Sequence, residues 1–199
     1  MGYTHYWRRE QELDPAAFTG FAADFSKVYE ASKDRIPLAG GLGEGLPSIT
    51  ADEVIFNGVE DCGHTVRDLG VAWPADEAGG VDTSGADVTA GNWFAGAKLS
   101  ARTCDGRCSH ETFWFPRVME MEPYDKPDEC GRYFQFCKTA FKPYDVLVTA
   151  TLIIAKHRFG DAIQVSSDGD QKDWFDGQML CQSVLGYGLS YDLKTLGGE

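Results

Sequence analysis

The sequence has no apolar run long enough to cross a membrane and no apolar segment at its start. Its longest apolar stretch, residues 146–155, is interrupted by two threonines and is far shorter than the ~20 residues that span a bilayer. The first ten residues also lack the apolar core of a secretory signal peptide. We therefore expect a cytoplasmic protein that makes no use of a membrane.

Basic residues are scarce. The chain contains 18 lysines and arginines against 31 aspartates and glutamates, so its formal net charge is −13. Nucleic-acid backbones and anionic membrane surfaces both require basic protein surface. The composition therefore argues against nucleic acid as a partner, and it leaves homo-oligomerisation open.

The familiar catalytic motifs are missing as well. The sequence contains no Walker phosphate loop, no GxSxG, no HExxH and no EF-hand loop. Whether the protein is an enzyme therefore stays open. The chain does have enough apolar side chains to form a hydrophobic core, because 43% of its 199 residues are apolar and 13% are aromatic. That amount fits one domain over residues 1–199 and excludes global disorder.

Hydrophobic periodicity predicts about three helices and several strands. The expected helices begin at Pro15, with Asp14 as its cap, and at Pro143, and a last one carries Trp174 and Leu185. The expected strands cover residues 3–8, 52–57, 65–71, 111–115, 133–138 and 162–166. Between 73 and about 110 the chain is loop-rich, because large apolar residues are few from 73 to 92.

The segment 133–166 reads as strand, helix and strand. Such a unit places its two strands parallel in one sheet. The helix between them, near residues 146–157, is apolar nearly all round and should be buried. The sequence therefore predicts an α+β (or α/β) fold with a single mixed sheet, which includes this parallel β-α-β unit and carries about three helices.

Soft metal-ligand donors gather in two places. Cys62 and His64 form one group, and Cys104, Cys108 and His110 form the other. Together they supply enough ligands for one tetrahedral zinc, although the spacing matches none of the common zinc motifs. The alternative is that they are reduced thiols and surface imidazoles, because a chain without a secretory signal has little use for disulfides.

A small anion could bind where the two predicted parallel strands end. Ligands in such sheets bind beyond the carboxyl ends of the strands, near helix N-termini. The polar residues expected at that edge are Lys138, Thr139, Lys142, Ser167 and Asp168. The alternative is that the lysines are solvated while Ser167 and Asp168 only cap a helix.

One pair of residues suggests acid–base chemistry. His5 lies on the first strand and Glu111 on another, so the two could act as a general acid–base pair in a small hydrolase. The alternative is a hydrogen-bonded core histidine within an aromatic strand.

Four stretches resemble a family of uncharacterised phage and bacterial proteins. They are GYTHYW at residues 2–7, ETF at 111–113, FCKT with KPYD over 136–145, and SDG at 167–169. The resemblance implies no activity, but it suggests a phage setting and hence the host cytoplasm. Our first hypothesis is a protein that binds, without turnover, a small anionic molecule such as a nucleotide or nucleotide-derived signal. The alternatives are a small hydrolase and an acidic protein-interaction module.

Overall fold

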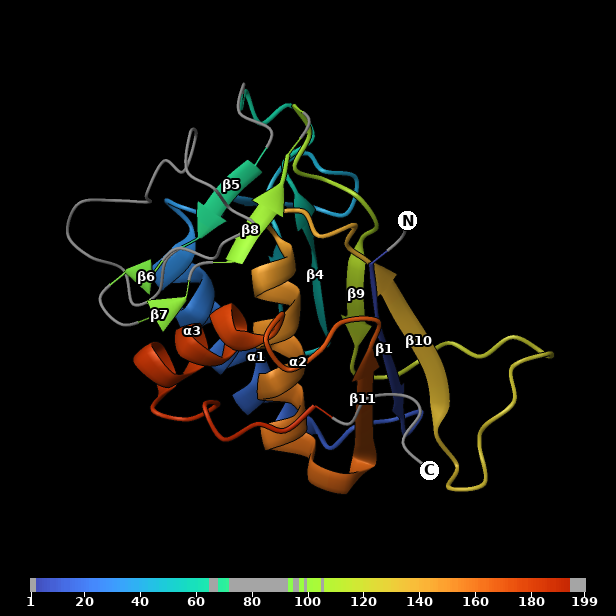
Figure 1. Ribbon diagram of the computed structural model, residues 1–199. Coiled ribbons are helices and arrows are strands. Elements are labelled where there is room, and N and C mark those ends of the chain that lie inside the picture. The colour runs from blue at the N-terminus through green and yellow to red at the C-terminus, as the bar shows by residue number, and fades with distance from the viewer. Residues whose placement is uncertain are drawn as a thin grey trace.

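The computed structural model describes residues 3–64, 68–71, 93–94, 97–98, 100–104 and 106–193 (Figure 1). Most of the predicted loop-rich excursion at 73–110 lies outside these residues. Among the described residues, two short strand pairings involve this region. Strand β5 (Asp68–Val71) pairs with β8 (Ser100–Thr103), and β6 (Trp93–Phe94) pairs with β7 (Ala97–Lys98).

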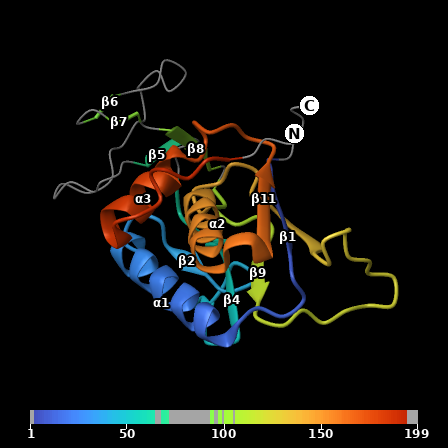
Figure 2. The same ribbon diagram turned by 90° about the horizontal axis from the view of Figure 1, so that it is seen from below.

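Three α-helices in the described part of the chain confirm the predicted α+β fold. They are α1 (Pro15–Ser32), α2 (Asp145–Phe159) and α3 (Phe175–Leu185), and a 3-10 turn at Gly160–Ala162 follows α2. The Asp14 side chain accepts a hydrogen bond from the backbone N–H of Ala17 at 2.8 Å, which is the expected cap of α1. Helix α2 lies between the strands and the other two helices (Figure 2). Every residue from 145 to 155 is buried. The apolar sequence of α2 is explained by this central position.

The three-stranded sheet corrects one prediction. It consists of β1 (Thr4–Arg9), β10 (Tyr133–Lys138) and β11 (Ile163–Ser167), in the order β10-β1-β11. Strands β10 and β11 do run in the same direction, but β1 lies between them and is antiparallel to both. The predicted pairing of adjacent parallel strands within 133–166 is therefore wrong. Antiparallel bonds to β1 replace the slightly weaker parallel ladder that the crossover would have formed.

A second sheet is built around β4 (Glu53–Gly58). This strand pairs with β2 (Leu38–Ala39), β3 (Ser48–Ile49) and β9 (Phe113–Pro116). Among the described residues every strand pairing is antiparallel, so the prediction of a single mixed sheet is also wrong.

Aromatic side chains join the two sheets to the helices. Trp7 of β1 lies 5.3 Å from Phe113 and 6.0 Å from Phe115, measured between ring centroids. Phe115 in turn packs against Phe21 of α1 and Phe159 of α2. These rings are buried, and burying each one contributes about 1.5–3 kcal/mol. The core therefore fixes β1 and β9 against α1 and α2.

Alternation along β1 separates a buried face from an outer face. His5, Trp7 and Arg9 are fully buried, whereas Tyr6 and Arg8 are partly exposed. The outer face of this sheet is the one turned away from α2. Of the helices in the described part of the chain, none has both the length and the apolar character to span a bilayer.

Asp24 of α1 contacts α2 and the segment just after α3, and these contacts predict that acid destabilises the fold. Its carboxylate accepts hydrogen bonds from Arg158 of α2, at 2.8 Å from Nε, and from the hydroxyl of Tyr187 at 2.9 Å, just after α3. Burial by itself would raise the pKa of Asp24, but these donors and Lys27 outweigh it and lower the pKa.

We expect Asp24→Asn to lower the free energy of unfolding by about 1–3 kcal/mol at pH 7. Because the folded-state pKa is depressed, this contribution is present above about pH 4 and is lost as the pH falls through the folded-state value. Urea unfolding of the parent and the variant from pH 7 to pH 2.5 measures it. A difference between the two proteins that stayed constant down to pH 2.5 would contradict the assignment.

Candidate metal centre and adjoining cleft

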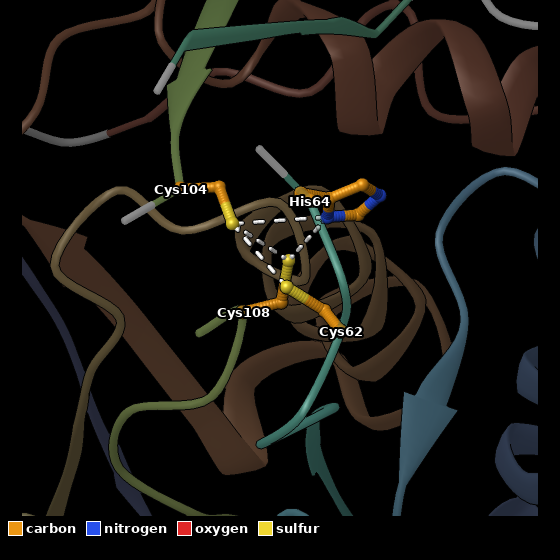
Figure 3. Close-up of side chains that lie close together, drawn as sticks. All are labelled: Cys62, His64, Cys104 and Cys108. Atoms are coloured by element: carbon orange, nitrogen blue, oxygen red, sulfur yellow. Dashed lines mark hydrogen bonds between the residues drawn. The ribbon is translucent and has the colours of Figure 1, made fainter. Parts of the chain in front are cut away.

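Two loops bring four soft donors together. The first loop follows β4 and carries Cys62 and His64, and the second follows β8 and carries Cys104 and Cys108. The backbone N–H of Cys108 donates to the carbonyl of Val59 at 3.0 Å, which holds the loops side by side. Figure 3 shows the four side chains pointing toward one another.

The distances within this cluster fit a tetrahedral metal ion. Sγ of Cys104 lies 3.4 Å from that of Cys62 and 3.5 Å from that of Cys108. Nδ1 of His64 lies 3.3 Å from the Cys108 sulfur and 3.7 Å from the Cys104 sulfur. All four ligand atoms lie within 4.8 Å of one another. Zinc with bonds of ~2.3 Å to sulfur and ~2.05 Å to nitrogen separates its sulfurs by ~3.8 Å and sulfur from nitrogen by ~3.6 Å. The cluster can therefore hold a metal such as zinc.

The electrostatics of the thiols also favour a cation. Burial opposes ionisation of Cys62, but hydrogen bonds from the His64 backbone and from the other two thiols outweigh it and lower the pKa of Cys62. For Cys108, burial and the neighbouring thiols raise the pKa. Within the cluster, ionisation is therefore easier for Cys62 than for Cys108. A divalent cation would provide the compensating charge.

Four of the five predicted metal ligands are in the cluster, and His110 is not. Its Nδ1 lies 2.8 Å from the carbonyl oxygen of Lys138, and its backbone N–H donates to Asn57 at 3.0 Å. Residue 110 is already on the path toward β9, so these contacts direct its imidazole toward β10.

Gly58 packs closely against the backbone of Cys108, so its replacement tests the proposed metal site. A Cβ atom at this position would lie 2.0 Å from the backbone oxygen of Cys108 and 2.5 Å from its carbonyl carbon. We expect Gly58→Ala to displace the Cys108 segment and to weaken zinc retention at least tenfold, measured by competition with a chromophoric chelator. Gly41→Ala is the matched control, because its Cβ would meet only side-chain atoms, at ordinary distances of 3.5 Å or more. Equal zinc retention in both variants would refute this reading.

A cleft of about 620 Å³ lies beside the cluster. Its lining residues are Glu60, Arg107, Ser109, His110, Glu111, Ala140 and Lys142. Two of them, Arg107 and Ser109, flank Cys108 in the chain. The cleft therefore shares its wall with the candidate metal centre.

Both carboxylates of the cleft are already engaged by the chain. Arg107 pairs with Glu60 through Nη1 at 3.1 Å, and the Ser109 hydroxyl donates to the other oxygen of Glu60. The carboxylate of Glu111 accepts the backbone N–H of Lys138. The negative charge that they present to a ligand is thereby reduced, while Arg107 and Lys142 supply N–H groups.

The predicted catalytic partner of His5 is replaced by another carboxylate. Nε2 of His5 lies 2.7 Å from Oδ1 of Asp145, and its Nδ1 lies 2.9 Å from the hydroxyl of Ser167. Glu111 instead lies in the cleft. The order Ser167, His5, Asp145 has the connectivity of a hydrolase triad. However, Ser167 is only 6% exposed, it accepts a hydrogen bond from the backbone of Gly169 at 3.0 Å, and it does not line the cleft.

Asp145 is the centre of a buried polar network. Its carboxylate also accepts the hydroxyl of Thr139 at 2.5 Å and pairs with Nε of Arg102 at 3.4 Å, and Arg102 pairs with Asp176 at 3.2 Å. Burial would raise the pKa of Asp145, but His5, Arg102 and Thr139 outweigh it and lower the pKa. Asp145 is in the first turn of α2, so the chain's own carboxylate takes the position where a ligand anion was expected.

The five residues predicted to bind an anion are not gathered in one pocket. Thr139 and Ser167 belong to the buried network, and Lys142 lines the cleft, where its Nζ donates to the carbonyl of Arg107 at 2.8 Å. Lys138 and Asp168 are exposed and lie at the same end of the three-stranded sheet, on either side of Thr4.

Sequence reasoning missed Arg102, Asp176 and the cleft residues Glu60, Arg107 and Ser109. Arg102 is in a stretch that reads as loop, so nothing indicated its burial. The position of Arg107 and Ser109 on either side of Cys108 is the one signal that pointed to the cleft.

Comparisons with known proteins add nothing to this description of the site. No match was found among models of protein families, among curated proteins or among solved structures. The resemblance to phage and bacterial proteins therefore stays a prediction.

Proposed function

We propose that this protein is a zinc-stabilised binding protein for a small anionic molecule. Zinc is held by Cys62, His64, Cys104 and Cys108, and the anion occupies the adjoining cleft. One observation carries both parts: Cys108 belongs to the cluster, while its neighbours Arg107 and Ser109 line the cleft.

The donor set supports a structural role for the metal. Three thiolates and one imidazole complete a tetrahedral shell, whereas catalytic zinc keeps one position for water or substrate. The metal would fasten the loop after β4 to the loop after β8. Neither a nucleophilic water nor a Lewis-acid step follows from such a site.

The chemistry of the cleft supports a carboxylate or phosphate ligand. A guanidinium carries five N–H groups in a planar fork, so Arg107 can bind an anion while it keeps Glu60. The hydrogen bonds donated to Glu60 and Glu111 offset part of the negative charge on their carboxylate oxygens. These carboxylates therefore repel an anionic ligand less.

The test combines metal analysis with anion binding. Elemental analysis of the purified protein should give about one zinc per chain. Pyrophosphate, used as the probe in calorimetry, should bind, and Arg107→Ala should weaken it by about 5- to 30-fold. Lys27→Ala is the control, because it removes an exposed cation from α1. Affinity should also fall as salt rises.

Two results would refute the proposal. The first is zinc below about one tenth of an equivalent. The second is pyrophosphate binding that is absent or identical in Arg107→Ala and the parent. Mass spectrometry of small molecules released from the purified protein would then identify the natural ligand.

A further inference from the structure

An aromatic surface lies on the outer face of the three-stranded sheet. Phe134 and Phe136 of β10 are 47% and 43% exposed, although both are large apolar side chains. The ring of Tyr6 on β1 is nearly parallel to that of Phe134, with 23° between the planes and 6.0 Å between the centroids. Phe134 and Phe136 are 5.9 Å apart. Exposed rings in such number on one sheet face mark a binding surface more often than a solvated one.

Cations accompany these rings. The guanidinium of Arg8 lies 5.1 Å from the centre of the Phe134 ring, and Nζ of Lys138 lies 5.5 Å from that of Phe136. The protein has a net charge of −13, but Arg8 and Lys138 give this surface two positive groups beside its rings, and Asp168 accepts the hydroxyl of Tyr6 at 2.9 Å. It matches a ligand that has both a planar ring and an anionic group.

A shallow pocket of about 260 Å³ adds polar groups to this surface. It is lined by Tyr6, Trp7, Arg8, Phe134, Gln164 and Ser166. The last two are on β11, where Ser166 is opposite Tyr6 and Gln164 is opposite Arg8. An amide and a hydroxyl can each donate and accept, so they can pair with the edge of a heterocycle whose face stacks on Phe134.

We propose that this outer face of β10-β1-β11 binds a mononucleotide. The base stacks on Phe134 and Tyr6, Gln164 and Ser166 contact its edge, and Arg8 or Lys138 binds the phosphate. The size of the pocket and the small number of cations fit one nucleotide. A nucleic-acid polymer would need a longer basic track, and the net charge of the chain would repel it. This site is separate from the cleft beside the metal cluster, because the two share no lining residue.

The experiment measures adenosine 5′-monophosphate binding by calorimetry, with ribose 5-phosphate as the probe without a base. Ribose 5-phosphate should bind at least tenfold more weakly. Phe134→Ala should weaken adenosine 5′-monophosphate by about 5- to 100-fold, the usual loss for one stacked base. Phe134→Trp should retain binding, since it keeps an aromatic face. Tyr124→Ala, which removes an exposed ring outside this pocket, should change nothing.

Several outcomes would overturn the proposal. They are undetectable binding at millimolar nucleotide, equal binding of the two probes, or equal binding by Phe134→Ala and the parent when circular dichroism shows both folded. Loss of binding in Arg107→Ala but not in Phe134→Ala would place the nucleotide in the cleft instead. A 12-mer of thymidylate that bound this face more tightly than the mononucleotide would make the ligand a single strand, contrary to the proposal.

Discussion

Cys104→Ser is expected to reduce the zinc content from about one equivalent to less than a tenth. Cys104 is fully buried, and its sulfur lies within 3.7 Å of three other donor atoms. A water molecule therefore cannot replace this sulfur as a metal ligand unless the cluster opens. Structural zinc contributes folding free energy directly, and we expect the free energy of unfolding to fall by about 3–5 kcal/mol. Elemental analysis and urea unfolding measure the two effects.

Cys130→Ser provides the matched control. Cys130 is exposed and lies outside the cluster, so this variant should keep its zinc and its stability. If Cys104→Ser retained a full equivalent of zinc, the proposed ligand set would be refuted. Equal stability of the two variants would show that the metal contributes nothing to the fold.

Asp145→Asn should destabilise the protein by about 3–5 kcal/mol at neutral pH, because it removes the charge that compensates buried Arg102. The amide keeps the shape of the side chain but cannot accept from His5, Thr139 and Arg102 together. Asp176 would remain as a partner of Arg102 at 3.2 Å, so the loss should stay within this range. Urea unfolding followed by circular dichroism provides the measurement.

Asp161→Asn is the control for charge alone. Asp161 is fully exposed and faces Lys156 at 3.6 Å, so its replacement should leave stability unchanged. Comparable unfolding midpoints for the Asp145 and Asp161 variants would show that the buried network is dispensable.

The three helices and the longer strands were predictable because their signals are local, whereas the short strands β2, β3 and β6 to β8 were not predicted. Asp14 and Pro15 mark the start of α1, and the apolar run near 146–157 marks a buried helix, which α2 is. The order of the strands was not predictable, because nothing local in β1 indicates that it enters between β10 and β11. An antiparallel strand with one apolar face fits either position equally well.

The residues of the candidate site were likewise predictable only in part. Donor type identified Cys62, His64, Cys104 and Cys108, since few other parts of the chain concentrate soft ligands. Sequence spacing alone could not show that His110 lies outside the cluster, because its imidazole is directed by its contact with the carbonyl oxygen of Lys138. The predicted anion pocket depended on two adjacent parallel strands. Once β1 lies between those strands, Thr139 and Ser167 face inward while Lys138 and Asp168 stay outside.

The central place of β1 has a consequence for the order of folding. Its residues pair with partners about 130 and 160 positions later in the chain, such as Lys138 for Thr4 and Ser167 for His5. During synthesis β1 is therefore made about 130 residues before β10 and about 160 residues before β11. Contacts of such long sequence separation slow folding, because the loop must close before the pairing is gained. Until β10 and β11 have been made, both edges of β1 are open, so the nascent strand is exposed to wrong strand partners.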